Sequence, residues 1–204
     1  VAYAFLGSEE GILEELFSEK GKAFYRFAVP IDLADAAGHR FGIAPDDWLE
    51  YIQGKFTERK MTIDDASVDR ILDATGGHPQ DTMQVCAALY YLLRDAGQRV
   101  VTADHVAIAY EQALRELERP FALHWTELGS QKYLQQVAKR IAHGAVLYAG
   151  ESGIPRPEVL RALESLRSRG LVTRLGRGRY DFVEPMFGEY VRRLDESAGI
   201  VPER

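Results

Sequence analysis

The sequence contains a single cysteine, Cys86, in 204 residues. One thiol cannot form an intramolecular disulfide or a cysteine-based zinc site, and it fits a protein of a reducing compartment. No apolar run approaches the roughly 20 residues that a membrane-spanning helix needs. The first residues also lack the basic region and the cleavage site of a secretory signal. We therefore predict a cytoplasmic protein with no membrane partner.

Catalytic motifs are equally scarce. The sequence has no HExxH, no GxSxG and no phosphate loop of the form GxxxxGK[ST]. The pairs Gly21-Lys22 and Gly54-Lys55 are followed by Ala23 and Phe56, not by Ser or Thr. The five histidines are scattered along the chain, so we expect no metal site and no catalytic residues. This chain is not expected to hydrolyse ATP by itself.

The charge is distributed unevenly along the chain. Hydrophobic residues make up 46% and charged residues 27%, the balance of a folded globular protein. Residues 1–129 carry 12 Lys and Arg against 22 Asp and Glu, whereas residues 130–193 carry 12 against 6. Such an asymmetry suggests two modules with different partners, the basic one binding an anion. The alternative is that the basic module simply docks on the acidic one.

The N-terminal segment predicts part of a parallel sheet. Residues 1–6 and 24–29 are typical of buried strands, and the helix between them starts at Ser8 as N-cap. Two strands alone do not form a stable parallel sheet. Because the sequence also begins with Val1, we expect residues 1–44 to continue a larger α/β domain.

Residues 45–125 predict an all-helical domain of four or five helices. Apolar residues recur here at helical spacing, between glycine and proline residues that punctuate helices. One helix is predicted to start at Pro45, and a second to start at Thr62 or Asp64 and to end at Gly76-Gly77. An apolar helix over 82–93 follows, and then a helix that is capped by Thr102 and broken at Pro120.

Residues 126–194 predict a winged helix-turn-helix. A helix capped by Ser130 precedes a helix over 157–169, a hairpin turning at Gly176-Arg177-Gly178, and a helix over 185–194. We expect residues 195–204 to be disordered. The fold class is thus mainly α, with a βαβ remnant of an α/β core.

The most specific local motif is Gly76-Gly77-His78-Pro79. A glycine pair lets the backbone approach a ligand closely, and the N-terminus of the next helix attracts anions. His78 adds a hydrogen-bond donor near neutral pH, and Pro79 fixes the entry angle. The alternative is an ordinary helix end followed by an N-terminal proline, which the residues alone favour.

A resemblance to a known family extends over about residues 1–194. The motifs that carry it occur in order: Phe5-Leu-Gly-Ser8, Phe24-Tyr-Arg26, Asp47-Trp48 with Ile52, Thr75-Gly-Gly-His-Pro79 with Gln84, and Val183-Glu-Pro-Met-Phe187. This pattern resembles the C-terminal half of archaeal-type P-loop ATPases, the AAA-like members of the STAND and origin-recognition-like group. The resemblance implies that 1–44 is the remnant of the nucleotide-binding core, 45–125 the helical lid and 126–194 the winged helix.

The resemblance also implies a function. The protein would be a nucleotide-dependent switch that couples lid movement to the winged helix. ATP or ADP with magnesium would bind mainly to a half that this sequence lacks, since Walker A and Walker B are absent. The residues implied to lie near the nucleotide are Ser8, at the γ-phosphate, with Arg26, Gly77, His78 and Pro79.

The basic module supplies a second function. Arg161, Ser165 and Arg169 lie on the outward face of the predicted recognition helix, and Arg174, Arg177 and Arg179 lie on or beside the wing. A helix in the major groove with a basic wing on phosphate is a standard way to bind double-stranded DNA. The alternatives are a winged helix that serves for packing or autoinhibition, and a helical adaptor that binds only a partner protein.

Overall fold

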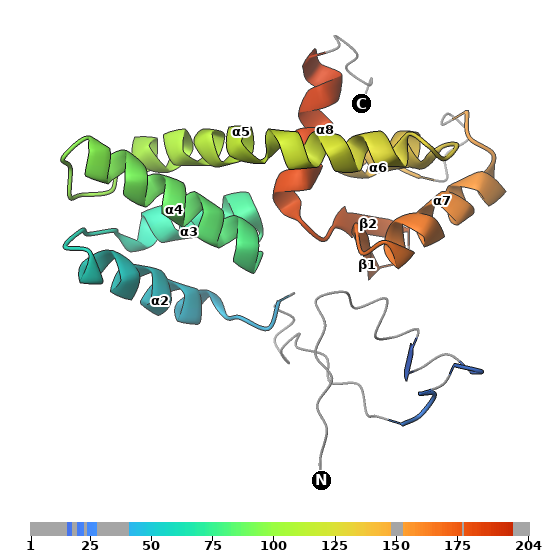
Figure 1. Cartoon of the computed structure of the whole chain (residues 1–204), viewed down its shortest axis with the longest axis horizontal. Coiled ribbons are helices and arrows are strands. Elements are labelled where there is room, and N and C mark those ends of the chain that lie inside the picture. The colour runs from blue at the N-terminus through green and yellow to red at the C-terminus, as the bar shows by residue number, and fades with distance from the viewer. Residues whose placement is uncertain are drawn as a thin grey trace. The chain divides into compact units, whose positions relative to one another are not determined.

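The computed structural model describes residues 16–17, 20–22, 24–27, 41–147, 153–176 and 178–197. Over these residues the fold is mainly helical, as predicted, with a two-stranded antiparallel sheet (Figure 1). The chain divides into two compact units, Leu33–Glu127 with Glu184–Arg204, and Val1–Asp32 with Leu128–Val183. None of the described helices is both long and apolar enough to cross a membrane.

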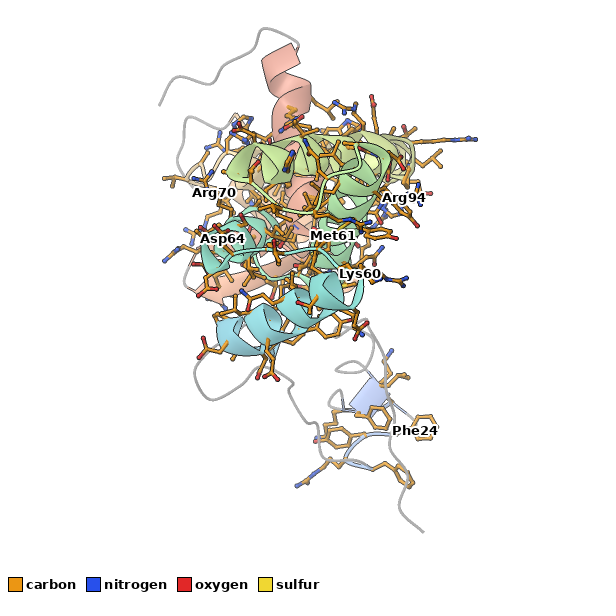
Figure 2. All side chains as sticks on the ribbon, turned by 90° about the vertical axis from the view of Figure 1, so that its left-hand side faces the viewer. Phe24, Lys60, Met61, Asp64, Arg70 and Arg94 are labelled. Carbon is orange, nitrogen blue, oxygen red and sulfur yellow. The ribbon has the colours of Figure 1, made fainter. Side chains whose placement is uncertain are left out.

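The first unit is a helical bundle. Its elements are α2 (Pro45–Glu58), α3 (Asp65–Thr75), α4 (Pro79–Asp95), nearly all of α5 (Ala103–Leu128), and α8 (Pro185–Ser197). In Figure 1, α3 and α4 lie between α2 and α5, and α8 crosses α5. Met61 is buried inside the bundle, whereas Arg70 and Arg94 point outward on opposite sides (Figure 2).

The helix boundaries in this unit follow from local chemistry. Pro45 occupies the first turn of α2, where its missing N–H costs nothing. Asp64 caps α3, because its carboxylate accepts the Ser67 N–H at 2.9 Å. Gly76 then ends α3 in the left-handed conformation, with φ of 58°. The predicted starts and the predicted stop of these two helices are confirmed.

Pro120 does not break α5, contrary to the sequence prediction. The helix continues through it from Ala103 to Leu128. Directly after the proline, the Phe121 ring packs against Phe187 and Tyr190 of α8, at 5.3 and 5.7 Å between ring centroids. We attribute the continuity of α5 to this packing, which offsets the hydrogen bond that proline removes.

The second unit contains α6 (Leu134–Ala142), α7 (Arg156–Ser168), β1 (Val172–Gly176) and β2 (Arg179–Phe182). Val172 pairs with Phe182, and the ladder becomes irregular between Arg174 and Gly176. The prediction of two helices followed by a hairpin is confirmed. Ser130 is not the cap of α6, however, because Tyr133 occupies that position in the left-handed conformation.

Two further predictions differ from the structure. Residues 24–27 form turns, closed by hydrogen bonds such as that from Tyr25 N–H to Lys22 O at 3.1 Å, and so do not start a strand. The remaining residues of the predicted βαβ unit lie almost wholly outside the described residues. Helix α8 continues past Leu194 to Ser197, into the segment predicted to be disordered, and it belongs to the helical unit.

Candidate functional site

The turn between α3 and α4 holds three of the predicted nucleotide-contacting residues. Gly77 has φ of 68°, His78 is the N-cap of α4, and Pro79 is its first residue. Gly76 lies so close to α8 that a Cβ there would be 3.1 Å from Pro185 Cγ. Both glycines are therefore required by the backbone, one by close approach and both by positive φ.

His78 is held from two sides. Its ring lies 5.0 Å from the Phe41 ring, nearly edge to face. Its Nδ1 accepts the Asp81 N–H at 3.3 Å and lies 3.3 Å from Asp81 Oδ1. Nδ1 cannot serve both contacts at once, because it accepts when it carries no proton and donates when it carries one. While Nδ1 accepts, the neutral ring carries its proton on Nε2, which is then the hydrogen-bond donor that the sequence predicts.

Asp81 connects this turn to the C-terminal helix. Its side chain is buried, and its Oδ2 accepts the Met186 N–H of α8 at 2.9 Å. The carboxylate therefore lies in the first turn of α4 and also caps the first turn of α8, where backbone N–H groups favour negative charge. This links the start of α4 to the start of α8.

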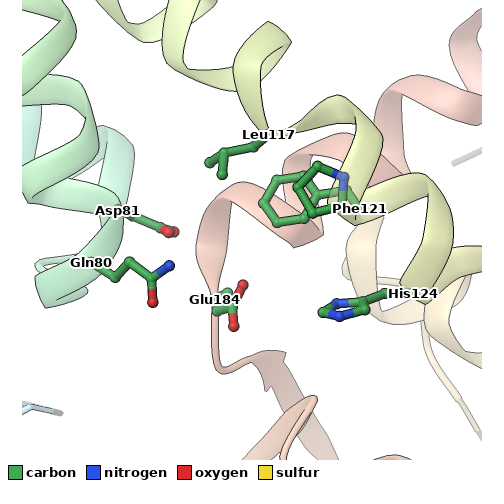
Figure 3. Close-up of a pocket in the computed structure, with 7 residues that line it drawn as sticks. Gln80, Asp81, Leu117, Phe121, His124 and Glu184 are labelled. Carbon is green, nitrogen blue, oxygen red and sulfur yellow. The ribbon is translucent and has the colours of Figure 1, made fainter.

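A pocket of about 170 Å³ opens beside Asp81. In the view of Figure 3, Glu184 lies between Asp81 and His124. The remaining lining residues are Gln80, Leu117, Pro120 and Phe121. Partial burial and the charge of Asp81 raise the pKa of Glu184, while His78 and His124 act in the opposite direction. Two acids this close make the pocket unfavourable for an anion.

Trp48 contributes an unsatisfied donor to the same turn. Its side chain belongs to α2 and is only 6% exposed, and a Cβ on Gly77 would lie 3.8 Å from its Nε1. This Nε1 is fully enclosed and has no hydrogen-bond partner. An enclosed donor without a partner costs about 1–3 kcal/mol.

Other chemistry in the described part of the chain is limited. Burial raises the pKa of Cys86 to about 12, so its thiol is not a nucleophile at neutral pH. No three His, Cys, Asp or Glu side chains of the described residues gather as a metal site. Among the other predicted nucleotide contacts, Ser8 lies outside the described residues. Arg26 has φ of 60°, and its backbone N–H donates to Phe17 O at 2.9 Å.

The predicted DNA-binding residues lie in the second unit. Arg161 is 75% exposed on α7 and pairs with Glu158 at 2.6 Å. Ser165 Oγ donates to Gln131 at 3.3 Å, and Arg174 Nε donates to Gly176 O at 3.2 Å. Arg169 and Arg179 are exposed, at the end of α7 and the start of β2. Arg177 lies outside the described residues.

One solved structure resembles the chain over most of its length. It is the Walker-type ATPase PABY2304 of Pyrococcus abyssi. The TM-score is 0.62 at 16% identity, and the match covers 91% of this chain and 51% of that one. The chain thus shares the fold of part of a Walker-type ATPase and spans about half its length. No protein-family model and no curated protein sequence matches the chain.

Sequence reasoning missed three residues of this site. Asp81 and Glu184 are far apart in sequence, and nothing in the spacing indicates that α8 starts beside α4. Trp48 lies at the helical spacing of the apolar residues of α2, which gives no sign of a further role. Only the folded chain places its Nε1 beside the Gly76–Pro79 turn.

Proposed function

We propose that the chain is the lid and C-terminal part of an AAA/STAND-like P-loop ATPase that acts as a nucleotide-dependent switch. The observation that carries this proposal is the fold likeness to a Walker-type ATPase over 91% of the chain. The turn at Gly77, His78 and Pro79 would contact the nucleotide, as the sequence resemblance implies. Walker A and Walker B would belong to a P-loop half that this sequence lacks.

The described residues near the turn fit the base and sugar of a nucleotide better than its phosphates. The N-terminus of α4 would attract a phosphate, but Asp81 and Glu184 place two carboxylates there. The base and sugar carry no charge and are compatible with these acids. In the proposal, the phosphates and magnesium are therefore bound by the P-loop half, and the lid contacts the nucleoside.

The link through Asp81 would make this lid a switch. A displacement of the Gly76–Pro79 turn moves Asp81 and with it the capped N-terminus of α8. Pro185, packed on Gly76, is pushed or released by the same motion. Because α8 follows β2 directly in the chain, its reorientation would be passed to the hairpin that precedes it.

The test of this function is a calorimetric titration of the complete protein, which includes the P-loop half, with ADP. We expect His78→Ala to weaken ADP binding at least fivefold. His105→Ala is the matched control, because His105 also accepts a backbone N–H at a helix start, from Thr102 at 3.2 Å. Equal affinities of the two variants would contradict the assignment. The reading frame upstream of Val1 is also expected to encode a GxxxxGK[ST] loop, and its absence would contradict the ATPase proposal.

A second proposal concerns the basic hairpin and α7. The observation that favours it is that Arg169, Arg174 and Arg179 are all exposed on adjoining elements. We expect double-stranded DNA to bind more weakly as salt rises, with a slope that becomes shallower in the Arg169→Ala and Arg179→Ala variants. Arg161→Ala should change the slope less, because Glu158 already neutralises it. Binding to a partner protein without any affinity for DNA would favour the adaptor alternative.

A further inference from the structure

The indole N–H of Trp48, beside the Gly76–Pro79 turn, is buried without a hydrogen-bond partner, and this calls for an explanation. The indole offers a single hydrogen-bond donor, and that donor is enclosed and unsatisfied. Arg140, the other described residue with an enclosed unpartnered nitrogen, still donates through Nη2 to Val146 O. Trp48 therefore loses its whole hydrogen-bonding capacity on folding, which proteins normally avoid.

The position of this donor points to a ligand. Nε1 faces Gly77, where a Cβ would lie 3.8 Å from it, directly before the N-terminus of α4. In the first turn of α4, Pro79 has no N–H, and the N–H groups of Asp81 and Thr82 donate to His78, so Gln80 supplies the backbone donor at this end. The rings of Phe41 and His78 lie beside the same turn. An indole donor, one backbone N–H and two aromatic rings thus lie around this turn, and these are the groups that bind a planar ligand with hydrogen-bond acceptors.

We propose that Trp48 donates its indole N–H to an acceptor atom of a nucleoside, on the base or the sugar, when ligand occupies this turn. The inference rests on the proposed function and adds to it the residue and the part of the nucleotide that it contacts. A neutral acceptor is favoured over a phosphate oxygen because Asp81, 3.3 Å from His78, and Glu184 repel an anion. Since Nε1 is enclosed in this conformation, the ligand reaches it only after Trp48 and Gly77 move apart.

The indole N–H can be observed directly by NMR. The chain has two tryptophans, so the amide spectrum of the labelled 204-residue chain shows two indole signals. Trp125→Phe leaves only that of Trp48, which assigns it. We expect adenosine and ADP to move the Trp48 indole signal downfield as a hydrogen bond forms, and inorganic phosphate to leave it in place.

The outcomes separate this inference from the proposed function. If ADP shifts the amides of Gly77 and His78 but not the Trp48 indole, the inference is wrong and the proposed function stands. If phosphate alone moves the indole signal, the nucleoside assignment is wrong. If millimolar ADP and adenosine move no signal of the chain, this inference fails, whereas the proposed function is decided separately by the calorimetric titration of the complete protein.

An isosteric replacement tests the donor without disturbing the packing. Benzothienylalanine at position 48 keeps the fused ring and replaces the N–H by sulfur. We expect a melting temperature no lower than that of the unmodified chain, with at least fivefold weaker adenosine binding. The same replacement at Trp125 is the control and should leave adenosine binding unchanged. A lower melting temperature with unchanged binding at position 48 would show that the donor is structural, and would overturn the proposal.

Discussion

Replacing Asp81 by Ala tests the connection between α4 and α8. The side chain is 2% exposed, and its Oδ2 accepts the Met186 N–H at 2.9 Å. Losing a charge-assisted hydrogen bond and leaving that N–H unpaired costs about 1.5–3 kcal/mol. The carboxylate also stabilises two helix N-termini by about 0.3–1 kcal/mol each. Relief of its repulsion with Glu184 offsets part of this loss.

We therefore expect Asp81→Ala to lower the free energy of unfolding by about 2–4 kcal/mol. In a chain of this size the melting temperature falls by about 5–15 °C. Asp81→Asn keeps an oxygen acceptor but loses the charge, so its loss should be about half as large. Urea denaturation followed by circular dichroism measures both values.

The matched control is Asp73→Ala on α3, an exposed acid that should change stability by no more than about 0.5 kcal/mol. If Asp81→Ala lies within the same range, Asp81 does not hold α8. The proposed route from the Gly76–Pro79 turn to α8 then loses its physical basis. A double variant with Glu184→Gln should lose more stability than the sum of the two single changes, because each single variant relieves the repulsion between the carboxylates and the double variant relieves it only once.

Three further predictions concern the helical unit. Gly76→Ala should destabilise it by about 1–2 kcal/mol because of its positive φ, whereas Gly54→Ala, in open space on α2, should stabilise it by about 0.5–1 kcal/mol in the same denaturation assay. Pro120→Ala should add about 1–3 kcal/mol by restoring a hydrogen bond within α5, and an unchanged midpoint would contradict this. The hydrogen bond from Arg193 lowers the pKa of Glu111 below its ordinary value of 4.5. The ionised Glu111 therefore stabilises the fold above pH 4.5, and this stabilisation is lost as the pH falls through the lowered pKa. Glu111→Gln should therefore destabilise the chain by up to about 1 kcal/mol at neutral pH, and by less at about pH 3.5; a difference that does not shrink in acid would refute this.

Much of the local structure could be predicted because it depends on neighbouring residues alone. Pro45 and Asp64 start helices through their own backbone and side-chain chemistry, and Gly76 ends one because it tolerates positive φ. Predictions failed where a distant contact overrides a local preference. Pro120 is the clearest case, since packing of Phe121 on α8 keeps the helix continuous.

The sequence by itself therefore determined the helices, the hairpin and the turn with its glycine pair, because helix capping, apolar periodicity and turn chemistry act over a few residues. Only the tertiary structure decided that α8 returns to the helical unit, that Asp81 caps it, and that Glu184 joins Asp81 beside one pocket. It also decided that the Trp48 N–H is left without a partner beside Gly77. These features depend on contacts between residues as far apart as 81 and 186, which local propensities do not encode.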